Sequence, residues 1–233
     1  KRQELTWLLT GMPTPTLNGV LRTDAEPGNV DALIESTLAH VRLKNVSRFA
    51  WWTGPDTVPA DLGLRLADHG LTFCEGSRGM AGGLLELEED LPAPAGLAIE
   101  QVRDLEMLDR WAHAAFSGLG FPQDGIGHGV ELFAGLGFDL PLRCYLGTLD
   151  GAPVATSQLF LGAGVAGIYI VATVPEARRL GIGTALTLAP LREARAMGYR
   201  IGILHASPMG FGMYHRLGFR EYCRMSNYQI QNG

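Results

Sequence analysis

A loop rich in arginine and glycine joins an apolar strand to a helix at residues 174–189, VPEARRLGIGTALTLA. Glycine lowers helix stability, so Gly181 and Gly183 at the start of a helix indicate that bare backbone is needed there. The first amides of a helix lack intrahelical partners and, together with the helix dipole, form an anion site. Arg178 and Arg179 add positive charge beside that site. The segment therefore predicts a strand, loop and helix that hold a phosphate group.

Two other phosphate-binding loops fit this segment poorly. A P-loop closes its glycine run with Gly-Lys-Ser/Thr, whereas here Gly183 is followed by Thr184 and Ala185. A dinucleotide-binding fingerprint needs a third glycine, where this chain has Leu186, and an acidic residue about 20 positions further on. A nucleotide-binding oxidoreductase is therefore disfavoured.

Composition limits the class of partner. The 233 residues are 46% hydrophobic and 18% charged, with a net charge of −5, which is typical of a globular protein without the basic excess of a nucleic-acid binder. We expect a small-molecule partner, with neither nucleic acid nor a membrane involved. The cysteines and two histidines lack disulfide or metal-ligand spacing, so we expect no metal and a cytoplasmic location; they are Cys74, Cys144, Cys223, His113 and His128.

A connector rich in proline and acidic residues predicts two domains. The connector 87–97, LEEDLPAPAGL, places the boundary between an N-terminal α/β domain, residues 1–95, and a second domain, residues 96–233. The first domain is predicted to hold helices at 31–43 and 59–70 and strands at 48–54 and 79–87. Residues 49–75 and 201–223 share an order of strand, proline-containing loop, helix and strand. We interpret the first domain as a degenerate copy of the second.

The second domain has the pattern of a mixed α/β fold whose sheet is mostly antiparallel and flanked by helices. Three successive strands are predicted within 142–174. They are preceded by a glycine-rich segment at 117–141, part of which is predicted to be a mobile helix-loop that would cover a ligand. The remaining predicted elements are a strand at 97–102, a helix at 104–116 capped by Asp104, a helix from Ile182, a strand at 199–204, a helix at 207–218 and a strand at 219–230.

The chain carries two motifs in this order: R-x-x-G-x-G at Arg178, Gly181 and Gly183, and the segment 207–219, SPMGFGMYHRLGF. They resemble the [QR]-x-x-G-x-[GA] loop and the N-x-x-A-x-x-x-Y-x-x-x-G-F pattern of the GCN5-related N-acetyltransferase (GNAT) family. The residues in register in the second motif are Ser207, Gly210, Tyr214, Gly218 and Phe219. The resemblance covers roughly residues 97–230 and implies the GNAT fold, with acetyl-CoA as co-substrate and an amine as acceptor.

The resemblance also implies roles for individual residues. The backbone of Val171 and Thr173 would hold the pantetheine arm of acetyl-CoA, beside a V-shaped opening between the strands at 165–173 and 200–204. Ser207 would make a polar contact with the cofactor or cap a helix. The loop would hold the diphosphate through Arg178, Arg179, Leu180, Gly181, Ile182, Gly183 and Thr184, in agreement with the helix-terminus argument.

Tyr214 would be the general acid that protonates the departing thiolate. The general base stays open, because the strand before the loop has no carboxylate; His205, Glu131 and water-mediated deprotonation are the candidates. We expect a small-molecule amine as acceptor, with a protein amine as the alternative, and a homodimer as a further expectation. A non-catalytic acyl-CoA sensor is the alternative function.

Overall fold

The structure, a computed structural model, describes residues 4–10, 17–88 and 90–230. The chain divides into two compact units: unit 1 contains Lys1–Arg78 and Cys223–Gly233, and unit 2 contains Gly79–Tyr222. Glu89, part of the predicted connector, lies outside the described residues. Within these residues, no helix is long and apolar enough to cross a membrane.

Unit 2 is built on a mixed sheet with the strand order β4-β9-β8-β7-β6-β5. Its antiparallel part runs from β5 to β8, and β8 pairs with β9 in parallel. Tight turns join the antiparallel strands, and Asp150 and Gly151 both have the positive φ that a two-residue hairpin requires. The strands are β5 (Leu97–Gln101), β6 (Leu142–Leu149), β7 (Ala152–Gly162), β8 (Val165–Thr173), β9 (Ile201–Ala206) and the end of β4 (Leu71–Gly83).

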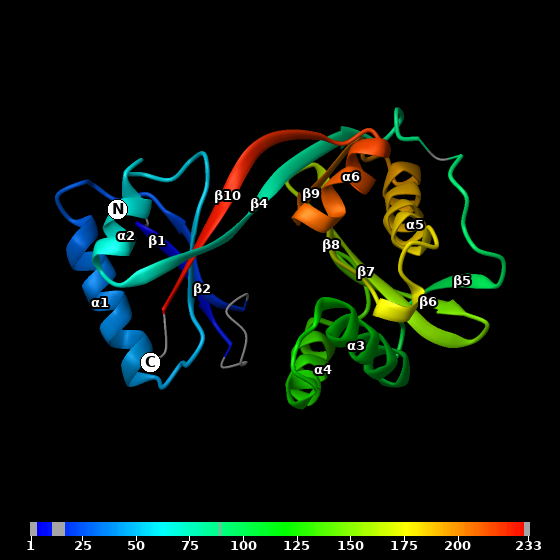
Figure 1. Ribbon diagram of the computed structural model, residues 1–233, viewed down its shortest axis with the longest axis horizontal. Coiled ribbons are helices and arrows are strands. Elements are labelled where there is room, and N and C mark those ends of the chain that lie inside the picture. The colour runs from blue at the N-terminus through cyan, green and yellow to red at the C-terminus, as the bar shows by residue number, and fades with distance from the viewer. Residues whose placement is uncertain (1–3, 11–16, 89, 231–233) are drawn as a thin grey trace. The chain divides into compact units, whose positions relative to one another are not determined.

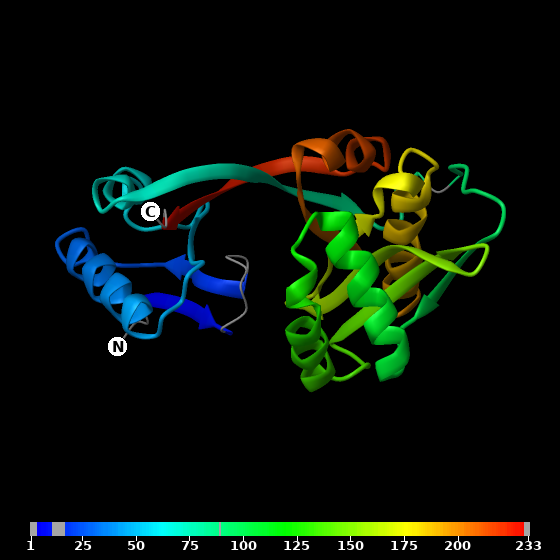
Figure 2. The same cartoon turned by 60° about the horizontal axis from the view of Figure 1, so that its bottom comes forward.

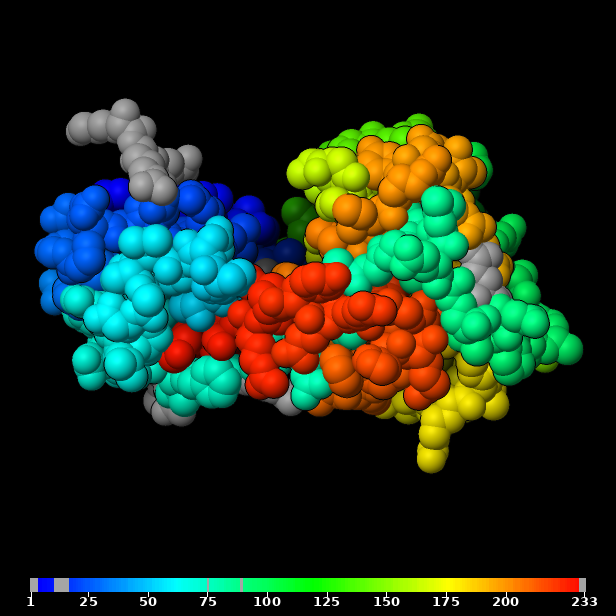
Figure 3. All heavy atoms as spheres, turned by 90° about the horizontal axis from the view of Figure 1, so that it is seen from above, coloured from blue at the N-terminus to red at the C-terminus, as the bar shows by residue number. Residues whose placement is uncertain are grey.

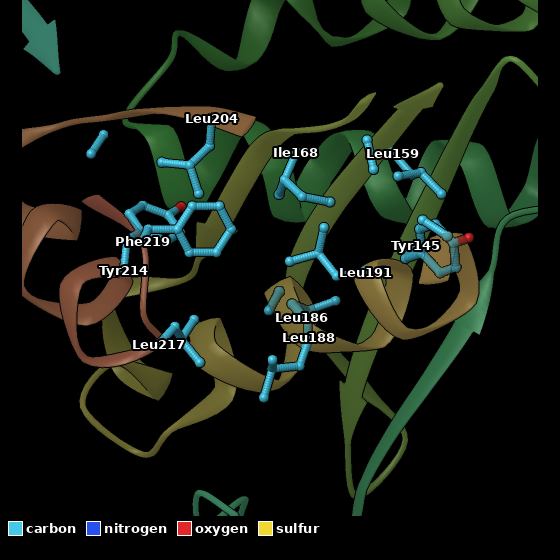
Figure 4. Close-up of a cluster of buried hydrophobic side chains, with 14 of the residues drawn as sticks. Tyr145, Leu159, Ile168, Leu186, Leu188, Leu191, Leu204, Tyr214, Leu217 and Phe219 are labelled. Atoms are coloured by element: carbon cyan, nitrogen blue, oxygen red, sulfur yellow. The ribbon is translucent and has the colours of Figure 1, made fainter. Parts of the chain in front are cut away.

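Helices cover both faces of this sheet, as Figures 1 and 2 show. One face packs on α3 (Leu105–Leu119) and α4 (Ile126–Leu136), and the other on α5 (Ile182–Ala196) and α6 (Pro208–Arg216). Alternate side chains of each strand enter the two cores. Figure 4 shows the core on the α5 side, where Leu186, Leu188 and Leu191 meet strand residues. The predicted mixed, mostly antiparallel α/β fold is confirmed.

Unit 1 is smaller and also mixes helices with a sheet, in the strand order β1-β2-β3-β10-β4. Helices α1 (Val30–Leu43) and α2 (Leu62–Asp68) pack on one core with the fully buried Trp51. The strands β1 (Leu5–Leu9) and β2 (Asn18–Thr23) were not predicted, because residues 5–23 carry no clear alternation of polar and apolar side chains. The other strands of unit 1 are β3 (Ala50–Thr53), the start of β4 and the end of β10 (Arg220–Ile230).

The strands β4 and β10 each belong partly to unit 1 and partly to unit 2. β4 follows α2 of unit 1 but lies beside β9 of unit 2, where the Leu84 amide donates to the Arg200 carbonyl at 2.8 Å. β10 follows α6 of unit 2 but pairs antiparallel with β3 of unit 1. The surface of β10 is visible in red in Figure 3. The units therefore do not divide the chain at the predicted boundary between residues 95 and 96; their limits fall within β4, after Arg78, and within β10, after Tyr222.

The two halves of the sequence repeat one order of elements. In the first half it is β2, α1, β3, α2 and β4, and in the second half it is β8, α5, β9, α6 and β10. The first and third elements pair in parallel in each case, Val20 with Trp51 in unit 1 and Ile168 with Leu204 in unit 2. This order agrees with the interpretation of unit 1 as a degenerate copy, which stays a prediction.

The glycine-rich segment 117–141 contains a helix, as its predicted helix-loop character requires. It contains the eleven-residue helix α4, whose residues Phe133 and Ala134 pack on the core beneath α3. Burial of these apolar side chains outweighs the low helix propensity of glycine. The helix α5 likewise continues through Pro190, which is buried in the core.

Candidate active site

The loop between β8 and α5 presents unpaired amides at the start of a helix. Gly181 is the N-cap of α5 and offers no side-chain cap, and the Ala185 amide makes the first intrahelical bond, to the Gly181 carbonyl at 3.1 Å. The amides of Ile182, Gly183 and Thr184 are therefore left without partners inside the helix. The first turn of α5 holds no acidic side chain. These amides, with the positive end of the helix dipole, form a site suited to a phosphate anion.

Gly181 and Gly183 serve different purposes in this loop. Gly181 has φ +83°, and a Cβ atom there would lie 2.5 Å from the Pro92 carbonyl oxygen, so both its conformation and its surroundings require glycine. Pro92 belongs to the predicted connector, which thus packs on the loop. A Cβ atom on Gly183 would make only ordinary contacts, 3.4 Å from Met213 Sδ and 3.7 Å from Thr173 Oγ1. The contact with Pro92 and the positive φ therefore account for glycine at 181, and the predicted close approach of both glycines to a phosphate stays a prediction.

The two arginines of the loop also differ. Arg178 donates from Nε to the Thr173 carbonyl at 3.1 Å and from Nη2 to the Gly118 carbonyl at 2.9 Å. Its side chain therefore ties α3 to the end of β8 and is turned away from the predicted phosphate contact. Arg179 is exposed and has φ +65°, a conformation unfavourable for a residue with a Cβ atom. The predicted contact of Arg179 with a phosphate stays a prediction; Leu180 beside it is 49% exposed.

The strands β8 and β9 form a fork. Their parallel pairing extends only from Ala166 opposite Gly202 to Ile168 opposite Leu204, although both strands continue. Beyond this point Ile170 has φ +47°, and the register of β8 against β7 shifts there. This bulge bends β8 and increases its local twist. The predicted V-shaped opening between the two strands is present, with its vertex at Ile168.

The open edge of β8 lies beyond this vertex. The Val174 amide donates to the Val154 carbonyl of β7 at 2.9 Å, so the backbone groups of Thr173 point toward the opposite edge. The Thr173 carbonyl there accepts the bond from Arg178, while β9 does not pair with Val171 or Thr173. The edge beside Val171 can therefore pair with an extended ligand, and the predicted role of these two residues stays a prediction.

Gly118 lets helix α3 touch this end of β8. A Cβ atom on Gly118 would lie 2.9 Å from the Ala172 Cβ atom and 3.0 Å from the Thr173 amide nitrogen. The signal for this contact in the sequence is a glycine in the last turn of an otherwise regular helix, which does not by itself identify the partner strand. The contact and the Arg178 bonds together fix the position of the fork's edge.

We expect Gly118→Ala to lower the free energy of unfolding by about 2 kcal/mol, because the clash with β8 outweighs the better helix propensity of alanine. Gly135→Ala is the matched control. Gly135 also precedes the last residue of its helix, but nothing lies within 4 Å of an added Cβ atom, so this variant should gain about 0.5 kcal/mol. Guanidinium denaturation measures both, and equal stabilities would contradict the contact.

Tyr214 lies in the core between α5 and α6, where its ring meets Phe219 edge to face at 6.2 Å (Figure 4). Burial raises the pKa of its phenol to about 12, and a hydrogen bond with the Thr187 hydroxyl partly opposes this rise. Thr187 in turn donates to the Gly183 carbonyl at 2.8 Å. Tyr214 is therefore protonated at neutral pH and connected through Thr187 to the first turn of α5. The sequence analysis did not identify Thr187. Its position four residues after Gly183 in a helix is a usable signal, because a threonine there can bond to the Gly183 carbonyl.

His205 lies on β9 one residue past the last pair with β8. Its side chain keeps contact with solvent, yet the protein atoms around it remove enough hydration to lower the imidazole pKa below 6.5. The imidazole is therefore neutral at pH 7 and able to accept a proton. Glu131 is exposed on α4, and its candidacy as general base stays a prediction.

Ser207 is the N-cap of α6, and its Oγ atom accepts a hydrogen bond from the Gly210 amide at 3.2 Å. Capping accounts for a serine at this position. Its predicted contact with the cofactor stays a prediction. Within the described parts of the chain, no group of three or more histidine, cysteine or acidic residues is placed to hold a metal ion.

The corresponding edge in unit 1 is occupied by the chain itself. Beyond the pair of Val20 with Trp51, the Val58 amide donates to the Thr23 carbonyl at 3.1 Å, and the Ala25 amide donates to the Val58 carbonyl at 3.0 Å. Trp51 Nε1 adds a bond to Thr23 Oγ1 at 2.8 Å. The loop that carries Val58 thus pairs with the edge of β2 as a strand would, so this edge has no room for a ligand.

Comparison with known proteins agrees with this geometry. Residues 163–222, which contain the fork, the loop and α6, match the family model described as the acetyltransferase (GNAT) domain. Among curated proteins, no sequence matches this chain. The predicted GNAT resemblance of the C-terminal part of the chain is confirmed.

Solved structures share the fold at low sequence identity. A GCN5-related N-acetyltransferase from Kribbella flavida is 19% identical, with a TM-score of 0.67 over 92% of this chain and 81% of that chain. A functionally unknown conserved protein from Staphylococcus epidermidis ATCC 12228 is 14% identical, with a TM-score of 0.73 over 100% and 93%. A tandem GNAT protein from the clavulanic acid biosynthesis pathway is 17% identical, with a TM-score of 0.64 over 96% and 76%. At these identities the likeness shows the fold.

Proposed function

We propose that this chain is an N-acetyltransferase that moves the acetyl group of acetyl-CoA directly to an amine. The observation that carries the proposal is the uncapped start of α5 beside the open edge of β8. The amides of Ile182, Gly183 and Thr184 fit the diphosphate of coenzyme A, and the edge at Val171 fits the amide-containing pantetheine arm. Acetyl-CoA supplies the thioester, and residues of unit 2 supply the remaining groups.

The proton transfers follow from the protonation states of two side chains. His205, neutral at pH 7, accepts the proton that the amine releases as its nitrogen bonds to the acetyl carbon. Tyr214, protonated at pH 7, donates its proton to the sulfur as the carbon–sulfur bond breaks. The products are an N-acetylated amine and the free thiol. After the thiol product has left, the Tyr214 phenolate takes up a proton from solvent. His205 releases its proton to water.

Unit 1 is proposed to bind no acetyl-CoA. Its edge is occupied by Val58, and the loop after β2 carries Asp24 and Glu26 in place of arginine and paired glycines. Acidic side chains repel a diphosphate. The chain should therefore bind one molecule of acetyl-CoA.

The test of the proposal is Thr184→Asp, which places a negative charge in the first turn of α5. A carboxylate there stabilises the helix through the dipole but repels the diphosphate. We expect the dissociation constant for acetyl-CoA to rise about 10-fold or more, with an unchanged or higher melting temperature. Thr184→Asn is the neutral control. Calorimetric titration should give one site per chain, and an unaltered affinity of Thr184→Asp would refute the loop as the diphosphate site.

The pH dependence of the rate tests His205 as the base. Its pKa is lowered below 6.5, so the base form persists at neutral pH and is lost as the pH falls through the lowered pKa. With acetyl-CoA saturating, kcat should show a limb that declines below pH 6.5, and His205→Gln should lose this limb together with most of the rate. A variant that keeps the limb would assign it to another group, such as the amine itself.

The acceptor is proposed to be a small-molecule amine, with a protein amine as the alternative. The predicted cover of the site carries Asp124, Glu131 and Asp139, whose charges favour a cationic acceptor. The absence of a carboxylate on β8 favours the second candidate function, a non-catalytic acyl-CoA sensor. A thiol-release assay separates the two, because a sensor binds acetyl-CoA without releasing thiol in the presence of any amine.

A further inference from the structure

Tyr169 is a residue of the fork that the proposed mechanism does not use. It follows Ile168, the last residue of β8 that pairs with β9. Its side chain is half-buried, and burial raises the pKa of its phenol above 10. Among the described residues, its hydroxyl has no recorded hydrogen-bond partner. A half-buried phenol at this position is thus free to bond to a ligand.

Tyr169 and His205 lie on the same face of the sheet. Leu204 and Ala206 of β9 enter the core on the α5 side, so His205 between them points to the opposite face. Ile168 of β8 enters that same core, so Tyr169 also points to the opposite face. Because Ile168 pairs with Leu204, Tyr169 and His205 are the next opposite residues in register, one on each arm of the fork.

Gly167 sets the position of the Tyr169 ring. A Cβ atom on Gly167 would lie 2.6 Å from Tyr169 Cε2 and 3.0 Å from its hydroxyl oxygen, so the ring lies over this glycine. Any larger residue at 167 would displace the phenol. The pair therefore holds the hydroxyl near the vertex of the fork.

The proposed cofactor site lies on the other side of the fork. Gly183 in the first turn of α5 lies close to Thr173 Oγ1 and to Met213 of α6, on the face that packs on α5 and α6. A thioester that enters the fork from that side can be reached by an amine from the face of Tyr169 and His205. On this face the amine meets a hydroxyl that can accept an N–H group and an imidazole that can accept a proton.

We propose that Tyr169 binds the acceptor: its phenol oxygen accepts a hydrogen bond from a primary amine and leaves the amine nitrogen beside His205, with Gly167 holding the ring in place. This inference rests on the proposed function, because it assigns the acceptor side of the same reaction. It commits to a primary amine, since the nitrogen must bond to Tyr169 and lose a proton while it attacks the acetyl carbon.

Two variants test the proposal, each with a matched control. Tyr169→Phe keeps the ring and removes the hydroxyl, and Tyr222→Phe removes a phenol that is 74% exposed on β10. Gly167→Ala displaces the Tyr169 ring. Gly162→Ala displaces a ring in the same way at the far end of β7, because its Cβ atom would lie 2.8 Å from Phe160 Cε1.

The measurements use tyramine, putrescine and glucosamine as probes. Steady-state kinetics give the KM of each amine and of acetyl-CoA, and NMR of ¹³C-tyrosine protein follows the Tyr169 signal during amine titration, with and without CoA. Tyr169→Phe identifies that signal by its loss.

We expect at least one amine to shift the Tyr169 signal. Both test variants should raise the KM of that amine by about 3- to 10-fold, which corresponds to one hydrogen bond, without changing the KM of acetyl-CoA. Both controls should match the wild type.

The proposal is overturned if no amine shifts the Tyr169 signal. It is also overturned if an amine that the wild type acetylates has the same KM in Tyr169→Phe. An equal rise in Gly162→Ala would also overturn it, because the effect would then be general to the sheet. Failure of the proposed function is a different result: the wild type would bind no acetyl-CoA or release no thiol with any probe, whatever the response of Tyr169.

Discussion

A fragment of residues 96–233 should fail to fold, although it contains the whole of the predicted second domain. It lacks Met80 of β4 and Leu84, the residue that follows β4, which are 2% and 1% exposed in the core on the α5 side. Removing a buried side chain of this size costs about 2–5 kcal/mol, and two such losses are comparable with the entire stability of a domain. The fragment also leaves the edge of β9 unpaired.

The fragment 79–233 is the control, because it restores Met80, Leu84 and the bond from the Leu84 amide to the Arg200 carbonyl. Circular dichroism and the dispersion of amide NMR signals should show ordered structure in 79–233 and its loss in 96–233. A cooperative unfolding transition in 96–233 would show that residues 79–95, with the end of β4, are dispensable for folding.

Replacing Tyr214 with phenylalanine should lower kcat by about 100-fold or more, the usual contribution of a general acid. The ring stays in the core beside Phe219, so the KM of acetyl-CoA should change little. The loss of the hydrogen bond with Thr187 should lower the free energy of unfolding by about 1 kcal/mol. Thiol release with saturating amine measures the rate, and thermal unfolding measures the stability.

Thr187→Val provides the control for this variant. It removes the same hydrogen bond and leaves the Tyr214 phenol in place, so stability should fall while the rate stays much closer to the wild type. Similar losses of kcat in Tyr214→Phe and Thr187→Val would show that the hydrogen bond between the two hydroxyls is needed only for structure. Tyr214 would then not be the general acid.

The loop and its helix could be predicted from local chemistry. Paired glycines and arginines at residues 178–183 indicated an uncapped helix start, and the structure has one at Gly181. The purpose of each residue could not be predicted in the same way. Arg178 bonds to carbonyls of α3 and β8, and Gly181 makes room for Pro92, because these partners are distant in sequence and are brought together only by the fold.

The limits of the units were beyond local reasoning for a related reason. The connector at 87–97 has the composition of an exposed linker, yet strand pairing is decided by contacts between distant segments. Nothing in the sequence of β4 or β10 distinguishes a strand that pairs within its own half from one that pairs with the other. His205 and Tyr214 could be located on a strand end and a helix, whereas the neighbour Thr187 required the three-dimensional packing.

The path of β4 and β10 through both units also bears on how the protein is made. During synthesis the first half leaves the ribosome before β10 is translated, so one edge of β3 stays unpaired until then. Unit 1 therefore completes its sheet only once β10 has left the ribosome, whereas the end of β4 that belongs to unit 2 is translated before the other strands of that unit. A ribosome that stalls before residue 220 would leave the sheet of unit 1 without β10.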